Sequence, residues 1–449
     1  MSKLFAGARI RTLRRSRSLT QVEMARQLDL STSYLNQLEN DQRPLTATVL
    51  LALTAAFPVE AAYFSPDSDA RTIADLQSAF PQVPGEQLGD LAARYPDLVP
   101  ELLELAHRGP REEASPYEAV RDFFYDARNY IGELDHLGEE LAGELGDPQF
   151  RLSRLAARLD ADAKVTVRFR RHSTGPRRIF HPEDRELHLR TGLTDAQNLF
   201  EIALQYALLV HPEVLERLAA PLPDTASRDV GRFGLAQYFA AAVVLPYERF
   251  RQVAEDYRYD IDRIAAHFGS GIETTCHRLS TLQRPGSRGV PFFFVRTDRA
   301  GNISKRQSAT SFHFSRSGGS CPLWVIHRAF EQPGRFVRQV ATMPDGRSYL
   351  WVARTVQGQV HGFATPRKEF AVGLGCDLGQ ADRLVYSQGL DLSPESGTPI
   401  GPGCTSCPRP HCPQRAFPQA ARPLGLDLNV TADEPYRTIN GGEKVASQK

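Results

Sequence analysis

Three of the six cysteines of this chain, Cys404, Cys407 and Cys412, are separated by only two and then four residues. A fourth, Cys376, stands in the short segment Gly373-Leu374-Gly375-Cys376. A Cys-x-x-Cys turn directs two sulfur atoms at a single centre, and thiolates with such spacing can surround one zinc ion or one iron–sulfur cluster. An ordinary hydrophobic core does not need this arrangement. The spacing therefore predicts a metal-binding segment near the end of the chain.

The composition is that of a soluble globular protein with about three domains. The chain has 449 residues, of which 41% are hydrophobic and 24% charged, and a domain takes roughly 150 residues. A formal net charge of +1 gives no general attraction to nucleic acid or membrane, so such a partner must be met by a local patch. No apolar run approaches the roughly 20 residues of a membrane span, and the first residues lack the apolar core of a signal peptide. We expect a cytoplasmic protein with no membrane partner, whose clustered cysteines bind metal rather than form disulfides.

The beginning of the chain shows the pattern of a small helical bundle. Six Lys or Arg residues and no acid lie within residues 1–17, around apolar positions that suit one face of a first helix. Thr20 followed by Glu23 predicts the start of a second helix, and Ser31 is placed to cap a third. A fourth helix is predicted over residues 47–57. We assign the buried side of the second helix to Val22, Met24, Ala25 and Leu28.

The third helix exposes hydroxyl and amide side chains, which hydrogen-bond to base edges and phosphates in the DNA major groove. Leu19-Thr20-Gln21 and Ser33-Tyr34-Leu35-Asn36-Gln37-Leu38-Glu39-Asn40 resemble the helix-turn-helix of phage-repressor-like (XRE-type) regulators. The resemblance places Gln21, Ser31, Thr32, Ser33, Asn36 and Gln37 at the DNA, and charge adds Arg9, Arg14 and Arg43 as phosphate contacts. The alternative is a solvated four-helix bundle that does not bind DNA.

The following segment is helical in character. Residues 66–115 are interrupted by prolines and are predicted to form a connector. From Tyr117 to about Leu145 the pattern predicts one amphipathic helix. Such a helix suits dimerisation, because operators are usually two-fold. The alternative is that it packs into the core of its own domain.

The central region has the order of elements of a metallopeptidase. The alternating segment 164–171 predicts a strand with Arg168 and Arg170 on one face and apolar side chains, including Phe169, on the other. Apolar helices are predicted at 198–209 and 233–246. Strands, first helix, second helix and a closing Leu-Pro are similar to the ImmA/IrrE-type metallopeptidase domain.

The catalytic groups of that peptidase family are absent from the matching positions. Its HExxH motif falls on Leu204, Gln205 and Leu208, and the carboxylate of its second helix falls on Leu235. Zinc hydrolysis requires imidazole or carboxylate ligands and a base. We therefore interpret the domain as a non-catalytic relative that retains an apolar ligand pocket. The alternative is a cleft that is filled in as ordinary core.

Strand-like runs between turn residues predict a sheet in the C-terminal third. These runs are 291–296, 324–326, 336–340 and 349–354. The predicted fold class is α+β and multidomain. It comprises an all-α helix-turn-helix domain (1–65), a helical connector (66–115), an α+β peptidase-like domain (116–285), a mainly β sensory domain with the cysteine cluster (286–423) and a disordered tail (424–449).

The whole layout is similar to the short-chain fatty acyl transcriptional regulators. The resemblance is carried by the first two domains together with Gly-Leu-Gly-Cys, Leu-Val-Tyr, Cys-x-x-Cys-Pro-Arg and Cys-Pro-Gln-Arg-Ala-Phe-Pro. It implies a DNA-binding regulator, not an enzyme, that controls propionate, glyoxylate and acetate metabolism, responds to short-chain acyl-CoA and carries a [4Fe–4S] cluster. The family's cysteine positions fall on Cys376, Cys404, Cys407 and Cys412, which we predict as ligands. Zinc is the alternative, since four thiolates suit it equally.

The phosphates of an acyl-CoA need cations, and Arg168 and Arg170 are selected for this role, with a solvated strand edge as the alternative. We expect a homodimer that binds a double-stranded DNA operator and whose recognition helices are respaced by acyl-CoA or by the state of the cluster. Two other functions remain open. A metallopeptidase that cleaves a repressor is disfavoured by the missing HExxH, and an antitoxin-like helix-turn-helix interaction protein is disfavoured by the cysteine cluster.

Overall fold

The computed structural model describes residues 6–17, 19–57, 59, 64, 69–80, 83–95, 98–106, 115–171, 175–308, 320–358 and 363–419. The chain separates into two compact units, and each is described by itself. The first holds residues 1–112, 311–318 and 402–449, and the second holds residues 113–310 and 319–401. Within the described ranges, no helix is both long and apolar enough to cross a membrane. The predicted tail, 424–449, lies outside the described residues.

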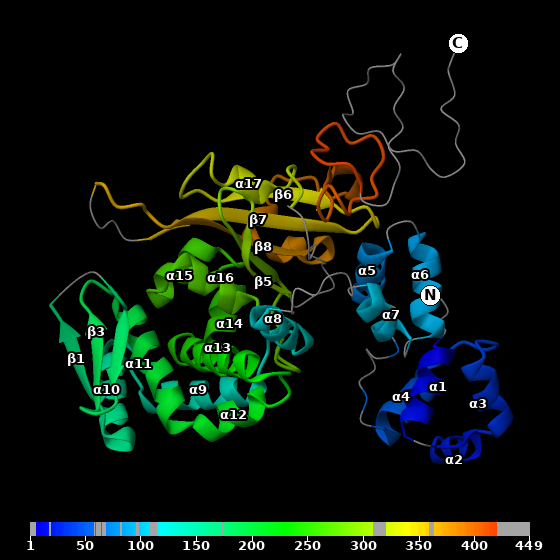
Figure 1. The fold of residues 1–449 in the computed structure, drawn as a ribbon, viewed down its shortest axis with the longest axis horizontal. Helices are drawn as coiled ribbons and strands as arrows, with labels where there is room; N and C mark the ends of the chain where they lie inside the picture. Colours follow the sequence, from blue (N-terminus) through cyan, green and yellow to red (C-terminus); the bar gives the residue numbers. More distant parts are fainter. Residues whose placement is uncertain are drawn as a thin grey trace, which may run out of the picture. The chain divides into compact units, whose positions relative to one another are not determined.

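The first unit opens with the four predicted helices (Figure 1). They are α1 (Gly7–Ser16), α2 (Gln21–Gln27), α3 (Thr32–Glu39) and α4 (Ala47–Ala56). The Thr20 side chain and Glu23 form a reciprocal capping box at α2, as predicted. Ser31 caps α3 by accepting a hydrogen bond from the Tyr34 N–H. Val22 was wrongly assigned to the buried side of α2, because 53% of its surface is exposed.

Three short helices follow in the connector. They are α5 (Asp69–Ala79), α6 (Gly85–Arg94) and α7 (Val99–Ala106). Leu76, Leu88 and Val99 form their common core, which is small. The predicted connector is therefore helical over these described segments.

The second unit begins with two helices where one was predicted. These are α8 (Pro116–Asp126) and α9 (Gly132–Glu144). The helix breaks because Arg128 and Asn129 both adopt left-handed backbone angles, with φ of 50° and 57°. In α9, Gly138 faces the helix α13 (Thr225–Val244) so closely that a Cβ atom there would lie 2.6 Å from the Ala242 Cβ. α9 therefore packs on α13 within its own domain, and a role of this segment in dimerisation stays a prediction.

A three-stranded sheet stands beside the helices of this unit (Figure 1). Its strands are β1 (Thr166–Arg170), β2 (Arg178–His181) and β3 (Glu186–Arg190), in the order β1-β3-β2. β1 pairs with β3 in parallel and β2 pairs with β3 antiparallel. The predicted strand is confirmed, but Phe169 is 55% exposed rather than buried, because β1 is an edge strand.

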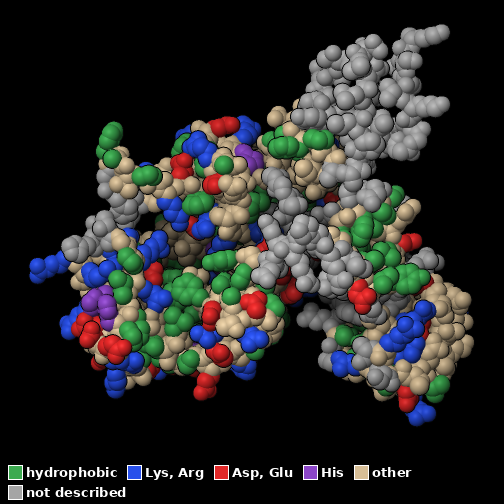
Figure 2. All heavy atoms as spheres, viewed as in Figure 1, with side chains coloured by type: hydrophobic (Ala, Val, Ile, Leu, Met, Phe, Trp, Pro, Cys, Tyr) green, Lys and Arg blue, Asp and Glu red, His purple; other side chains and the backbone are tan. Residues whose placement is uncertain are grey.

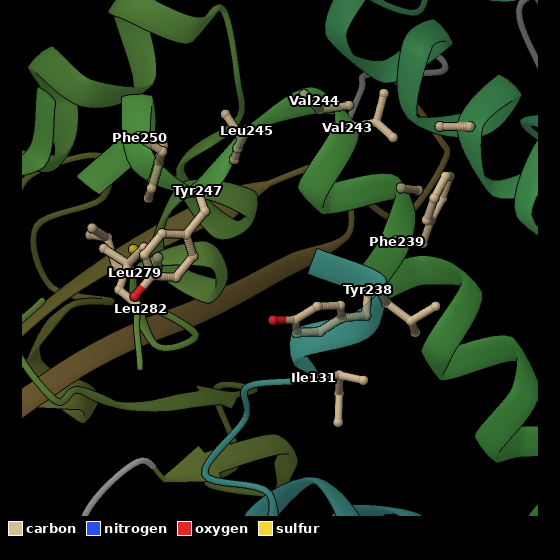
Figure 3. Packing of buried hydrophobic residues seen from close by; sticks show 14 of the residues in the cluster. Ile131, Tyr238, Phe239, Val243, Val244, Leu245, Tyr247, Phe250, Leu279 and Leu282 are labelled. Atoms are coloured by element: carbon tan, nitrogen blue, oxygen red, sulfur yellow. The ribbon is translucent and has the colours of Figure 1, made fainter. Parts of the chain in front are cut away.

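Helices form the centre of the second unit. They are α10 (Arg151–Ala163), α11 (Asp195–Val210), α12 (Pro212–Ala219), α13 (Thr225–Val244), α14 (Tyr247–Asp256), α15 (Ile261–Phe268) and α16 (Ile272–Leu279). The predicted apolar helix at 198–209 is confirmed as part of α11, and the one at 233–246 is confirmed as part of α13 up to Val244, where α13 ends. The second half of α13 is buried almost all round, as Figure 3 shows for Tyr238, Phe239 and Val243. A helix that is apolar on every side belongs in a core.

The larger sheet has six strands. They are β4 (Phe293–Thr297), β5 (Ile303–Ser308), β6 (Val337–Thr342), β7 (Ser348–Gln357), β8 (Glu369–Asp377) and β9 (Thr398–Pro399), in the order β5-β4-β8-β7-β6-β9. Phe294, Val352 and Leu374 share one core with the helices. The run 324–326 was wrongly predicted as a strand. Its residues 325 and 326 begin the short helix α17 (Val325–Arg328), and the adjoining Trp324 ring packs on Trp351 with the ring centroids 4.6 Å apart.

Candidate functional sites

α3 carries most of the side chains that the sequence predicts to meet DNA. Thr32, Ser33 and Asn36 are exposed and Gln37 is partly exposed. The Ser31 hydroxyl is already used in capping α3. The amide N–H of Gln21 donates to Asn36 Oδ1 at 3.2 Å, so α2 and α3 hold these two predicted base-reading side chains together. Arg43 is exposed, and its guanidinium lies 5.6 Å from the centre of the Tyr34 ring.

Glu39 fixes this surface from beneath, which the sequence did not reveal. Its side chain is 1% exposed and accepts two hydrogen bonds from Arg14, at 2.6 and 3.0 Å, and one from Gln21 at 2.7 Å. The pairing with Glu39 raises the pKa of Arg14. Arg14, proposed as a phosphate contact, is therefore used to hold α1 against α3, and Arg9 is buried. Glu39 lies between the apolar Leu38 and the polar Asn40, so the sequence pattern does not show which way it faces, and only the packing shows its role.

The positions of the lost peptidase ligands lie in packed core. Leu204 is 2% exposed, Gln205 4% and Leu235 0%. The Arg178 guanidinium of β2 donates a hydrogen bond to Gln205 Oε1 and approaches Glu201 Oε2 at 3.5 Å. In the peptidase family, the helix at the position of α11 carries the zinc ligands. In this chain, a polar contact from Arg178 of β2 to α11 lies at that position. This packing favours the filled-cleft alternative over an apolar pocket at these positions.

Four arginines, Arg170, Arg177, Arg178 and Arg190, form an arginine cluster around the small sheet. Arg170 and Arg190 are register partners in the β1–β3 pair, although like charges on neighbouring strands repel. Figure 2 shows basic, acidic and histidine side chains side by side over this sheet. Burial raises the pKa of Glu201, while Arg178, Arg177 and Arg190 act to lower it. The Glu201 carboxylate therefore lies within the electrostatic reach of three guanidiniums of this cluster.

The two predicted phosphate-binding arginines differ in their surroundings. Arg168 is 61% exposed and pairs with Glu186, with its Nε 3.1 Å from Glu186 Oε1. Arg170 donates to the carbonyl oxygen of Pro176 and belongs to the arginine cluster. The remaining members of the cluster were missed, because their convergence depends on strand pairing that the sequence does not display.

The cysteine loop is organised around Arg415, which is 4% exposed. Its guanidinium donates to the carbonyl oxygens of Cys404 at 2.9 Å, Cys407 at 3.3 Å and Arg409 at 2.5 Å. The Ala416 N–H donates to the Cys404 sulfur at 3.3 Å. Hydrogen bonds to sulfur are typical of cluster ligands, so the donor set fits a thiolate-bound metal. Over the described ranges, no three His, Cys, Asp or Glu side chains are already arranged to hold a metal ion.

Cys376 lies in a different environment. It belongs to the second unit, in β8, where it is fully buried opposite Leu350. Burial raises the pKa of this thiol well above its usual value, so the folded strand holds it neutral. Cys404, Cys407 and Cys412 belong to the first unit. The role of Cys376 as a fourth ligand therefore stays a prediction.

Three protein-family models match the chain in succession. Residues 10–64 match "Helix-turn-helix", residues 160–280 match "IrrE N-terminal-like domain", and residues 281–436 match "Short-chain fatty acyl coenzyme A regulator, C-terminal". The order is that predicted from the sequence.

Similar proteins extend over nearly the whole chain. The "HTH-type transcriptional regulator PrpR" of Mycobacterium tuberculosis is 49% identical and covers 97% of this chain and 96% of its own length. The "Propionyl-CoA carboxylase regulator" of Cereibacter sphaeroides is 39% identical, covering 98% and 99%. A solved structure, "Mycobacterium tuberculosis transcriptional regulator", is 49% identical with a TM-score of 0.69 and covers 72% of this chain and 99% of its own.

Proposed function

The chain belongs to the short-chain fatty acyl coenzyme A regulators, and from this we propose that it is a DNA-binding transcriptional regulator of short-chain fatty acid metabolism that responds to short-chain acyl-CoA. The relatives named above are named as regulators, and the match extends over nearly their full length. The helix-turn-helix of this chain presents an ordered polar face on α3. A homodimer on a two-fold operator is part of this proposal, because a single helix-turn-helix binds weakly.

The observation that carries the proposal is that the peptidase-like domain lacks catalytic groups. Leucines and a glutamine occupy the positions of its ligands and base, and Leu204 and Leu235 are part of the hydrophobic core. These positions therefore lack the zinc ligands and the general base that hydrolysis requires. The domain thus keeps the architecture of an enzyme but offers a charged surface in place of a catalytic centre, which suits a sensor.

We assign the phosphates of the acyl-CoA to the arginine cluster. Guanidiniums bind phosphate through paired N–H donors. Arg170 and Arg190 lie side by side on β1 and β3, and a bound phosphate would relieve their mutual repulsion. Arg168 already has Glu186 as a counter-ion, so we expect it to contribute less.

We further propose a [4Fe–4S] cluster at Cys404, Cys407 and Cys412, with Cys376 as the fourth ligand and zinc as the alternative metal. Such a cluster supplies one-electron redox chemistry. The Ala416 N–H and the buried Arg415 provide positive electrostatic surroundings for the thiolates of the loop. Metal and sulfide analysis of anaerobically purified protein distinguishes cluster from zinc.

Titration of the purified protein with propionyl-CoA tests the sensor. We expect saturable binding that changes the affinity for a DNA site selected from a random pool. Arg170→Gln should weaken propionyl-CoA binding, whereas the neighbouring Arg168→Gln serves as the matched control with a smaller effect. Absence of binding, or an effect on DNA equal to that of an unrelated dinucleotide, would contradict the proposal.

A further inference from the structure

The side-chain amide of Asn36, on the exposed face of α3, belongs to a chain of hydrogen bonds that joins α1, α2 and α3. Gln21 Nε2 donates to Asn36 Oδ1 at 3.2 Å, and Asn40 Nδ2 donates to the same oxygen at 2.9 Å. An amide oxygen has two lone pairs, so both acceptor positions of Asn36 are occupied. The Asn36 side chain is nonetheless exposed, and its N–H groups donate to no residue that the structure describes.

The orientation of the Gln21 amide is fixed by a group that can only accept. Gln21 Nε2 donates to Glu39 Oε2 at 2.7 Å, and Glu39 in turn pairs with Arg14. A carboxylate paired with an arginine has no proton to donate, so the nitrogen of Gln21, and not its oxygen, must face Glu39. The other N–H of the same nitrogen is the one that reaches Asn36.

Two further groups fix the Asn40 amide in the same way. Asn40 Nδ2 donates to the main-chain oxygen of Asn36 at 2.9 Å, an atom that only accepts. Asn40 Oδ1 accepts from Arg11 Nη2 at 2.5 Å, a group that only donates. The Asn40 nitrogen therefore faces Asn36, as the Gln21 nitrogen does. Only the side-chain oxygen of Asn36 can accept from both, so its nitrogen is the atom left for another partner.

The base pairs of the major groove differ in what such an amide can read. Guanine presents two neighbouring acceptors there, N7 and O6, whereas adenine presents the N7 acceptor beside the N6 amino donor. The usual contact of asparagine with adenine uses one N–H and the amide oxygen together. Because the Asn36 oxygen is already used, only its N–H donors remain. Donors without an acceptor fit guanine.

We propose that Asn36 is a specificity-determining residue that reads a guanine of the operator through its amide N–H groups alone. This role rests on the proposed DNA-binding function and adds the base that one side chain selects. Arg11 and Asn40, together with Gln21, are positioning residues, because they hold the Asn36 amide in one orientation. The same orientation disfavours adenine, since its N6 amino group would face donors rather than an acceptor.

Selection of binding sites from a random DNA pool tests the role of Asn36, with the full-length protein and its Asn36→Ala variant side by side. We expect the parent to enrich a guanine at one position of each half-site. Asn36→Ala should lose that preference by about tenfold, while the other positions stay enriched. Gln27→Ala is the matched control, because Gln27 is an exposed amide of α2 that lies outside this chain of hydrogen bonds. The control should select the same sequence as the parent.

Base analogues and a positioning variant identify the atoms involved. Replacing the selected guanine by 7-deazaguanine removes the N7 acceptor, and in fluorescence anisotropy it should weaken binding of the parent by about fivefold. The same replacement should not affect Asn36→Ala, which has no amide to lose. Asn40→Ala frees one lone pair of Asn36, so the ratio of guanine to adenine affinity should fall toward one. A purely structural loss would weaken both sequences alike, and an unchanged ratio would contradict the positioning role.

Other results would overturn the role of Asn36. An unchanged selected sequence in Asn36→Ala would do so, as would equal weakening of the parent and the variant by 7-deazaguanine. A selected adenine whose N6 amino group is required for binding would show that an amide oxygen faces the base. The proposed function is tested separately, because a selected sequence that does not depend on Asn36 leaves DNA-binding regulation intact. If the parent selects no sequence at all, that function and the role of Asn36 fail together.

Discussion

Gly375 lies opposite Trp351 in the β7–β8 pair, and the space of its missing side chain is filled by aromatic rings. A Cβ atom at Gly375 would lie 2.0 Å from Phe293 Cε2 and 2.8 Å from Trp351 Cδ2. Leu374 and Cys376 point to the opposite face, into the core shared with the helices. Packing against the aromatic rings therefore explains the second glycine of the Gly-Leu-Gly-Cys motif.

Gly375→Ala should destabilise the second unit by about 1 to 3 kcal/mol, the usual cost of overpacking a core. Both rings are fully buried and cannot move into solvent. Gly373→Ala is the control, because its nearest neighbours, Ile326 and Val295, would lie at 3.1 Å. Urea denaturation measures the difference, and equal losses in the two variants would refute the packing explanation.

Cys376→Ser and Cys276→Ser together test the metal ligand set. Both thiols are buried, and burial raises the pKa of each well above its usual value. If Cys376 is a ligand, its substitution should lower the metal content of the purified protein while Cys276→Ser leaves it unchanged. Unchanged metal in both variants, with loss in Cys407→Ser, would restrict the ligands to the loop.

Several features of the fold could be predicted because they depend on neighbours in the chain. The caps at Thr20 and Ser31 need only the next three residues, and the alternation in β1 follows from one segment. The break at Arg128 and Asn129 has no glycine or proline to announce it.

The sites depend on contacts between distant segments, and the sequence reveals these poorly. The arginine cluster exists because β1 and β3 pair in parallel, which brings Arg170 beside Arg190. Likewise, Lys305 lies beside Arg296 only through the β4–β5 register. The reading face of α3 was predictable because Asn36 and Gln37 share one helix, whereas its support by Glu39 requires the packing of α1.

Glu39→Gln should weaken DNA binding by about tenfold, or about 1.4 kcal/mol. The substitution removes the charged partner of Arg14 and loosens Gln21, so the side chains that meet DNA lose their fixed positions. Glu23→Gln is the control, because the Glu23 side chain is exposed and accepts its hydrogen bonds from the cap residue Thr20. Fluorescence anisotropy with the selected DNA measures both, and equal affinities in the two variants would contradict the role of Glu39.

Arg278→Met should destabilise the second unit by about 3 to 5 kcal/mol, the usual cost of breaking a buried ion pair. Arg278 Nη2 lies 2.6 Å from Asp135 Oδ1, and both side chains are at most 1% exposed. Arg284, at 3.4 Å from Asp135, compensates in part. The double variant Asp135→Leu/Arg278→Met should lose less than the sum of the single losses. Additive losses in chemical denaturation would show that the pair is not coupled.

The stability of the unliganded protein should depend on pH through Lys305. The pKa of this lysine is lowered to about 8 from 10.5, so the folded state disfavours the charged form. The free-energy cost of the charged lysine to the folded state is complete below about pH 8. It is relieved as the pH rises toward 10.5, because the lysine of the unfolded chain also releases its proton near that pH. Among the groups around Lys305, Glu273 opposes this shift and Arg296 supports it. On α8, which packs against β5, Arg121 is paired with Glu118 and Asp122.

Lys305→Met should therefore be more stable than the parent below pH 8, by a margin that shrinks between pH 8 and 10.5. Chemical denaturation across this range measures the margin, and a margin that grows with pH would show that the lysine is stabilised in its charged form.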